Sequence, residues 1–152
     1  MLAVELFRPE DLPALRTLMA DYLREFAPDD DPAAEWDDPF YTAWLAGVQA
    51  GTHTIWLARK DGNFIGFALV RCERHWYRRT RVTGVIDEFY IAPQHRRHGF
   101  GRALVARAVA ALRDQGIEVI TANVVQMNLR ALLFWQQVGF KIEAYHLFLQ
   151  VR

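Results

Sequence analysis

The stretch from Val85 to Ala106 constrains the fold more than any other part of the chain. It starts with the β-branched and aromatic residues of a strand, stops at Pro93, passes through a basic turn and continues as a helix from near Gly101. A glycine turn that leads into a helix presents unpaired backbone N–H groups at the positive end of the helix dipole. The stretch therefore predicts an anion site, most naturally for a phosphate.

The spacing of this turn separates it from two common phosphate-binding motifs. It reads Arg96-Arg97-His98-Gly99-Phe100-Gly101, an Arg-x-x-Gly-x-Gly. A dinucleotide fingerprint instead needs Gly-x-Gly-x-x-Gly, and a P-loop needs Gly-x-x-x-x-Gly-Lys-Ser/Thr. A second pattern lies further along the chain and consists of Asn128, Ala131, the aromatic pair Phe134-Trp135 and Gly139-Phe140.

Together these patterns closely resemble the two signatures of the GCN5-related N-acetyltransferases, in which the first grips the pyrophosphate of acetyl-coenzyme A. The resemblance covers the chain from about Ile55 to the C-terminus, and more loosely the N-terminal helices. It implies an α/β fold with a mixed, mostly antiparallel sheet flanked by four helices. We expect residues 1–152 to form a single domain of this type, because this length suffices for one core.

The resemblance also implies a set of residues that bind acetyl-coenzyme A. Backbone N–H groups of Phe89, Tyr90 and Ile91, freed where the fourth and fifth strands splay apart, would hold the acetyl and pantetheine units. The pyrophosphate would lie against the turn, at Arg96, Arg97, His98, Gly99, Phe100, Gly101 and Arg102. Asn128 would contact the pantetheine or adenosine side, and the pair Phe134-Trp135 would wall the thiol end.

Two adjacent acids, Asp87 and Glu88, interrupt an otherwise apolar strand. Acids rarely occupy a sheet interior without a partner or a chemical task. Strict alternation would place them on opposite faces, Asp87 with Phe89 and Ile91, and Glu88 with Ile86 and Tyr90. An amine must lose its proton before it attacks a thioester, and a carboxylate whose pKa is raised by burial is suited to accept that proton.

The resemblance implies that Asp87 is this general base, because it falls where diamine and polyamine acetyltransferases carry their catalytic carboxylate. Glu88 is the second choice. The alternative for either acid is a structural role, bonded to an arginine or to a backbone N–H.

The general acid is not evident from the motifs. Many family members place a tyrosine seven residues after the asparagine, where this chain has Trp135, and an indole N–H is no useful proton donor. Either the thiolate leaves unassisted, which a thiol pKa of about 8.5 makes tolerable, or Tyr145, Tyr90 or His146 replaces the tyrosine.

Three further segments allow both a structural and a functional interpretation. Residues 27–39 hold six acids, three prolines and no cation, typical of a solvated loop, but an acidic lip with Asp29, Asp30 and Asp31 would attract a cationic amine. Five arginines lie between residues 71 and 81, where they would keep an exposed hairpin tip and its edge strand soluble. The alternative is that they contact an acidic partner or the 3′-phosphate of the cofactor. The helical spacing of Tyr41 and Trp44 favours packing in the core. The alternative is that the two side chains line a pocket.

Periodicity predicts the remaining elements. Apolar residues at helical spacing indicate helices up to residue 26 and over 40–50, 101–116 and 128–137. Alternating or β-rich runs indicate strands over 2–7, 52–59, 64–72, 117–124, 140–142 and 144–151, with an Asp-Gly turn between the second and third.

Composition excludes several classes of protein. The net charge is zero and the pI is about 7.0, which argues against a nucleic-acid binder that needs excess cations. The one cysteine, Cys72, excludes an internal disulfide and a cysteine metal cluster, so we expect no metal. No apolar run reaches the roughly 18 residues of a membrane span and the N-terminus lacks a secretory pattern, so we expect no membrane partner and a cytoplasmic location.

We therefore expect an N-acetyltransferase that moves an acetyl group from acetyl-coenzyme A to a primary amine of a small cationic molecule, by direct attack with a carboxylate base. A non-catalytic module that binds or senses acyl-coenzyme A is one alternative, and a protein lysine or N-terminal acetyltransferase is another. The resemblance leaves a homodimer open, because such folds often dimerise through their C-terminal strands. Neither the acceptor nor the oligomeric state follows from the sequence.

Overall fold

Five strands form one sheet, in the order β1-β2-β3-β4-β5, within the part of the chain that the computed structural model describes, residues 1–26, 28, 38–75 and 77–151. The strands are β1 (Leu2–Leu6), β2 (His53–Lys60), β3 (Asn63–Arg74), β4 (Val82–Ile91) and β5 (Ile120–Ala122). Strands β1 to β4 pair antiparallel with their neighbours, and β5 runs parallel to β4. The predicted mixed, mostly antiparallel sheet is confirmed.

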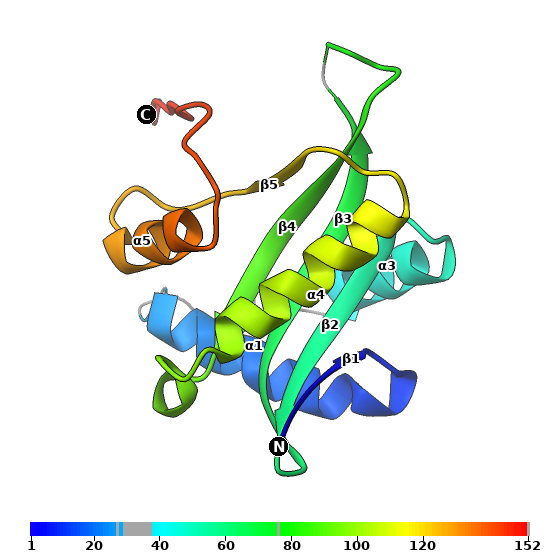
Figure 1. The fold of residues 1–152 in the computed structure, drawn as a ribbon, viewed down its shortest axis with the longest axis vertical. Coiled ribbons are helices and arrows are strands. Elements are labelled where there is room, and N and C mark those ends of the chain that lie inside the picture. The colour runs from blue at the N-terminus through cyan, green and yellow to red at the C-terminus, as the bar shows by residue number, and fades with distance from the viewer. Residues whose placement is uncertain (27, 29–37, 76, 152) are drawn as a thin grey trace.

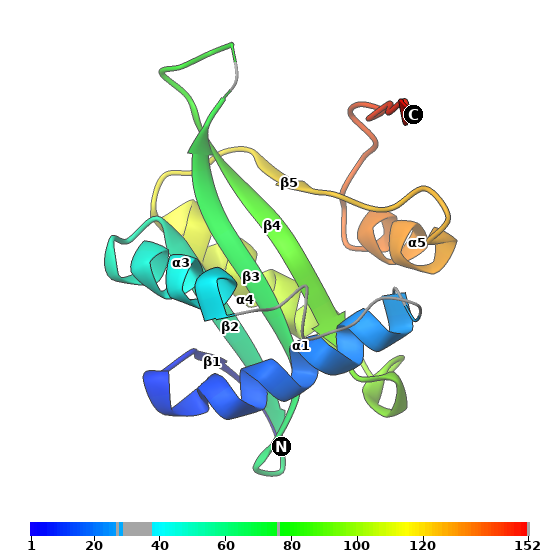
Figure 2. The ribbon, with the colours of Figure 1, turned by 180° about the vertical axis from the view of Figure 1, so that it is seen from behind.

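The described ranges contain four α-helices: α1 (Leu12–Phe26), α3 (Asp38–Gln49), α4 (Phe100–Asp114) and α5 (Leu129–Gln137). Helix α4 crosses the face that is in front in Figure 1, and α1 and α3 cover the face that is in front in Figure 2. Short 3-10 turns, η1 (Pro9–Asp11) and η2 (Pro93–His95), follow β1 and β4. The four predicted helices are confirmed.

The sheet separates two apolar cores. On the α4 face, Leu104 lies in one core with Ile86. On the other face, Met19 of α1 and Tyr41 of α3 lie in a second core with Phe67. The central parts of β2 and β3 are buried on both sides, which explains their nearly continuous apolar sequences. Strands β2 and β3 are therefore packed against an apolar core on each face of the sheet.

Both predicted hairpins are present. Strands β2 and β3 are joined by the Asp-Gly turn, in which Asp61 and Gly62 take left-handed φ values of 49° and 85°. The arginine-rich segment joins β3 to β4, and its Arg81 lies 3.9 Å from the carboxylate of Glu118.

The end of the sheet differs from the prediction. Strand β5 is limited to Ile120–Ala122, no strand forms over 140–142 or 144–151, and every residue from Lys141 to Val151 is exposed. A strand persists only where a neighbour satisfies its main-chain hydrogen bonds. Residues 144–151 do alternate in the sequence, but they meet no partner strand among the described residues.

Candidate active site

Strands β4 and β5 separate after a short pairing, and this opens the sheet. Pairing ends at Ile86 opposite Ala122. Beyond this point β4 continues to Ile91, while the chain after β5 turns away towards α5 (Figure 1). One side of residues 87–91, the open segment of β4, therefore has no partner strand in the described chain, and the predicted residues Phe89, Tyr90 and Ile91 lie on it.

The turn before α4 has a backbone suited to an anion. Arg97 and Gly99 take left-handed φ values of 63° and 81°, and Gly99 is the N-cap residue of α4, which begins at Phe100. Left-handed residues in such turns curve successive N–H groups into a concave site, and the first turn of a helix leaves its N–H groups without intrahelical partners. Nothing lies within 4 Å of a Cβ placed at Gly99, so the space in front of the turn is open. The turn fits a phosphate group.

Arg96 is bound within the chain. Its Nε donates to the carbonyl oxygen of Ile91 at 2.7 Å, and its Nη1 and Nη2 donate to the two carboxylate oxygens of Glu25, each at 2.6 Å. The guanidinium carbon lies 5.6 Å from the ring centroid of Tyr90. This side chain therefore ties the end of α1 to the end of β4 and the turn. Glu25 is a residue that the motifs did not indicate.

The other predicted residues around the turn lie at the surface. Arg97, His98 and Arg102 are exposed, and the two arginines give the turn a positive rim. Asn128 caps α5, because its Oδ1 accepts a hydrogen bond from the N–H of Ala131 at 3.1 Å.

Aromatic side chains close one side of the open segment. The ring centroid of Phe89 lies 5.3 Å from that of Phe134 and 5.2 Å from that of Trp135. A Cβ at Gly101 would lie 3.2 Å from the ring of Phe134, so α4 approaches this cluster closely because position 101 carries no side chain. The structure thus brings together Phe89, Phe134, Trp135 and the start of α4.

A β-bulge changes the faces of the two acids. Consecutive residues of β3 pair with Glu88 and Ile86, so Asp87 is an extra residue with no partner of its own. In consequence Ile86 and Ile91 lie in the same core beside α4, although strict alternation would separate them. Glu88 turns to the opposite face, where Tyr22 of α1 donates a hydrogen bond to it.

Asp87 faces the same side as Glu88. Its carboxylate accepts a hydrogen bond from Nε of Arg71 at 2.6 Å, and Arg71 also pairs with Glu73. Arg71 stands opposite His53 of β2, whose ring packs edge-on against Trp44 of α3 at 4.5 Å. Both acids therefore lie towards α1 and α3, and the prediction that they face opposite sides is wrong.

The environment of Glu88 suits a proton acceptor. Burial raises the pKa of Glu88, the charge of Asp87 raises it further, and the hydrogen bond from Tyr22 partly opposes this rise. Burial also raises the pKa of Tyr22, so its hydroxyl stays protonated and remains a donor. The ring of Tyr22 is held between Phe67 and Tyr90, at 6.0 Å and 5.7 Å between centroids.

The candidate general acids are not brought to the aromatic cluster. Tyr145 is 83% exposed and the neighbouring His146 is also exposed, both beyond α5. Tyr90 is buried in the core beside α1, on the other face from Phe134. The predicted acidic lip with Asp29 lies outside the described residues.

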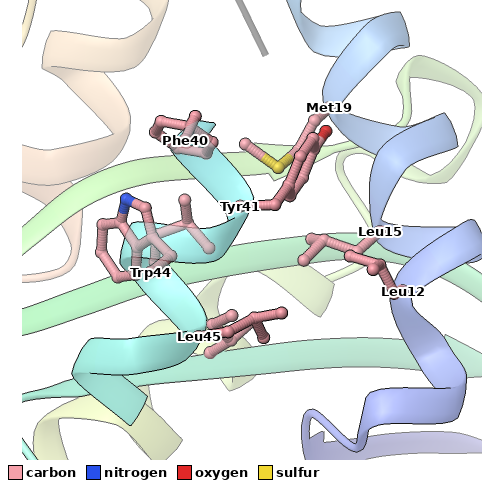
Figure 3. A pocket seen from close by; sticks show the side chains of 9 residues that line it. Leu12, Leu15, Met19, Phe40, Tyr41, Trp44 and Leu45 are labelled. Carbon is pink, nitrogen blue, oxygen red and sulfur yellow. The ribbon is translucent and has the colours of Figure 1, made fainter. Parts of the chain in front are cut away.

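Tyr41 and Trp44 pack in the core, as their spacing favoured. Figure 3 shows Tyr41 pointing from α3 towards Met19 of α1, across a hollow that nine apolar or aromatic residues line and that leaves no room for a water molecule. The guanidinium carbon of Arg16 lies 4.2 Å from the centroid of the Tyr41 ring. This hollow is therefore not a binding site for an amine.

Within the described ranges, no helix combines the length and the apolar character needed to cross a membrane. No three acidic, histidine or cysteine side chains in those ranges are grouped so that they would hold a metal ion.

Comparison with known sequences places this geometry in context. A sequence model described as the acetyltransferase (GNAT) family matches residues 13–140. Streptothricin acetyltransferase of Streptomyces lavendulae is 30% identical over 94 residues, which cover 62% of this chain and 47% of that protein. The L-amino acid N-acyltransferase MnaT of Escherichia coli is 27% identical over 119 residues, covering 74% of this chain and 67% of that one. The chain thus spans about half to two thirds of the length of these relatives.

Among solved structures, the aminoglycoside N-acetyltransferase AAC(6′)-Iy in complex with CoA superimposes with a TM-score of 0.80. The superposition covers 100% of this chain and 95% of that one, at 17% sequence identity. At this identity the similarity shows a shared fold.

The raised pKa of Glu88 has a consequence for stability. An acid whose pKa rises on folding contributes stability below its ordinary pKa of 4.5, and this is lost as the pH rises through the raised value. We therefore expect Glu88→Gln to have a higher Tm than the wild type at pH 7.5, and the difference to vanish below pH 4.5. Thermal unfolding followed by circular dichroism measures this, with the exposed Glu118→Gln as control. A lower Tm of Glu88→Gln at pH 7.5 would contradict the expectation.

Proposed function

Because this chain belongs to the acetyltransferase (GNAT) family, we propose that it moves an acetyl group from acetyl-coenzyme A to a primary amine of a small cationic molecule. One observation carries the proposal. The bulge in β4 turns Glu88, a partly buried acid, to the face beside α1. Glu88 lies on the open segment of β4, which leads to the turn that fits a phosphate group. The candidate proton acceptor thus lies on the strand that leads to the candidate anion site.

Three features support binding of the acyl donor. The N–H groups at the start of α4 would take the pyrophosphate, with Arg97 and Arg102 adding positive charge. The N–H groups of the open segment would hold the pantetheine and stabilise the carbonyl oxygen as charge develops on it. Phe89 and Phe134 would wall the thiol end. When bound, acetyl-coenzyme A supplies an acetyl group activated as a thioester.

The surroundings of Glu88 support a cationic acceptor. Burial raises the pKa of this carboxylate, and no cation among the described residues contributes to its environment. A substrate ammonium would offset the buried negative charge, and the carboxylate would then accept its proton. Asp87 is already held by Arg71, so we assign it the positioning of this segment. We therefore propose Glu88 as the general base, whereas the resemblance implied Asp87.

The relatives support a small molecule as the acceptor. Their names refer to streptothricin, to L-amino acids and to aminoglycosides, and each of these is a small molecule. No metal is part of the proposed reaction, because attack by a free amine on a thioester requires only a proton acceptor and donors for the carbonyl oxygen.

The two acids differ in their expected kinetic effect. We expect Glu88→Gln to reduce kcat/KM by about 10² to 10⁴-fold near neutral pH, and the loss to shrink at higher pH, where more of the amine is already deprotonated. Asp87→Asn should reduce it less. Release of coenzyme A thiol with a panel of amines, aminoglycosides included, measures both variants. A larger loss in Asp87→Asn would return the base to Asp87, and no release with any amine would favour a binding module.

Tyr22→Phe tests the same carboxylate independently. The Tyr22 hydroxyl lowers the pKa of Glu88, against the effect of burial. Without this hydrogen bond the pKa rises further, so ionised Glu88 requires a higher pH. We expect the acid limb of the profile of kcat/KM against pH to move to higher pH. A limb that stays in place in a folded variant would exclude Glu88 as the base.

Gly99 and Gly62 provide a matched pair for the donor site. Both have left-handed φ values, 81° and 85°, and nothing lies within 4 Å of a Cβ at either. Each change to Ala should cost roughly 1–2 kcal/mol of stability through backbone strain. Only Gly99→Ala should weaken acetyl-coenzyme A binding, by about tenfold or more, equivalent to about 1.4 kcal/mol. Calorimetry measures this, and equal affinities of the two variants would refute the phosphate site.

A further inference from the structure

Arg96 and Glu25 join three elements that approach one another where β4 ends. Nη1 and Nη2 of Arg96 donate to the two carboxylate oxygens of Glu25, each at 2.6 Å, and Nε donates to the carbonyl oxygen of Ile91 at 2.7 Å. Three hydrogen bonds from one planar guanidinium fix its orientation. The last turn of α1, the end of β4 and the turn before α4 are thereby tied together (Figures 1 and 2).

The carbonyl oxygen that Arg96 binds lies on the open side of β4. The N–H of Ala92, in the same peptide group, donates to the carbonyl oxygen of Ile65 at 2.8 Å. Because the C=O and N–H of a trans peptide group point in opposite directions, the carbonyl oxygen of Ile91 points away from β3. No described strand pairs with this end of β4 on that side. Arg96 thus satisfies the last carbonyl group of the open segment.

Arg96 is also the first residue of the turn that fits a phosphate group. Its carbonyl oxygen accepts a hydrogen bond from Nδ1 of His98 at 2.7 Å, and Arg97 between them has a left-handed φ of 63°. A residue other than glycine keeps such a conformation only where the surrounding structure holds it. The direction of the N–H groups that follow therefore depends on how firmly the side chain of Arg96 is anchored.

Glu25 lies where local interactions disfavour an acid. It is in the last turn of α1, where the negative end of the helix dipole favours cations. Its side chain is 43% exposed and that of Arg96 is 26% exposed, and ion pairs near the surface add little to stability. The elements that the pair holds in place therefore explain it better than the stability that it adds.

We propose that Glu25 is a positioning residue of the acyl-donor site. Through Arg96 it holds the open segment of β4 and the turn before α4 in the arrangement that receives coenzyme A. This inference rests on the proposed function, in which these two elements take the pantetheine and the pyrophosphate. Glu25 acts on the bound molecule only through Arg96, whose guanidinium is occupied by Glu25 and Ile91.

A role as a charge and a role in positioning predict opposite effects of Glu25→Gln. If Glu25 acted only as a charge, its loss would remove a negative charge near an anion site and free a guanidinium, so acetyl-coenzyme A would bind more tightly. If Glu25 positions Arg96, the change leaves the guanidinium one acceptor in place of two, and binding weakens. We expect the Kd of acetyl-coenzyme A to rise about tenfold, equivalent to about 1.4 kcal/mol.

Calorimetry with acetyl-coenzyme A measures this change, with Asp21→Asn as the matched control. Asp21 lies one turn earlier on α1 and pairs with Arg24 of the same helix at 2.6 Å, so its loss removes an equal charge without releasing Arg96. We expect Asp21→Asn to leave the Kd nearly unchanged. Tighter or unchanged binding in a folded Glu25→Gln would overturn the inference alone, whereas a wild type that binds no acetyl-coenzyme A would overturn the proposed function as well.

Arg96→Lys tests the geometry, because it keeps the charge but replaces the planar guanidinium by a single ammonium. We expect it to weaken binding as Glu25→Gln does, and the double variant to bind no more weakly than either, as for two residues that act through one contact. With a saturating amine, Glu25→Gln should raise the KM for acetyl-coenzyme A and change kcat little. Additive losses in the double variant, or a fall in kcat at unchanged KM, would contradict the positioning role.

Discussion

The short pairing between β4 and β5 is the constraint on which the rest of the site depends. After Ile86 the two strands part, and no described strand pairs with one side of β4 along the residues that lead to the turn before α4. Main-chain groups without a strand partner must bind water or a ligand. The same separation lets Phe134 of α5 meet Phe89 and the start of α4. A single interrupted ladder therefore produces the open main chain, the aromatic wall and the access to the turn.

The bulge at Asp87 decides what this open segment faces. One extra residue brings both acids to the side of α1 and α3, where Arg71 binds Asp87 and Tyr22 binds Glu88. Removing an acid from water without a cation costs free energy, and the raised pKa of Glu88 expresses that cost. Perturbed pKa values cluster at functional sites, which favours a chemical task for Glu88. Arg96 joins the two sides of this arrangement, because it binds Glu25 of α1 and the end of β4 at once.

Most of the fold could be predicted because its elements depend on residues that are close in sequence. The Asp61-Gly62 turn, the Asn128 cap and the apolar periodicity of α4 each involve a few neighbouring positions. The same local reasoning predicted strands over 140–142 and 144–151, and this prediction is wrong because no strand forms there. Their propensity for β structure is local, but a strand also needs a partner, and no strand of the described chain pairs with them.

For the site, the sequence by itself determined the turn before α4, its glycines and the aromatic pair Phe134-Trp135 within α5, since these are local patterns of backbone and side-chain type. Only the tertiary structure decided which groups face one another. Glu25, the partner of Arg96, lies 71 residues earlier, and the bulge that places Glu88 beside Tyr22 depends on the register of β3 against β4. The physical reason is range: backbone conformation is set largely by neighbouring residues, whereas burial, pairing and pKa depend on atoms that folding brings together from distant positions.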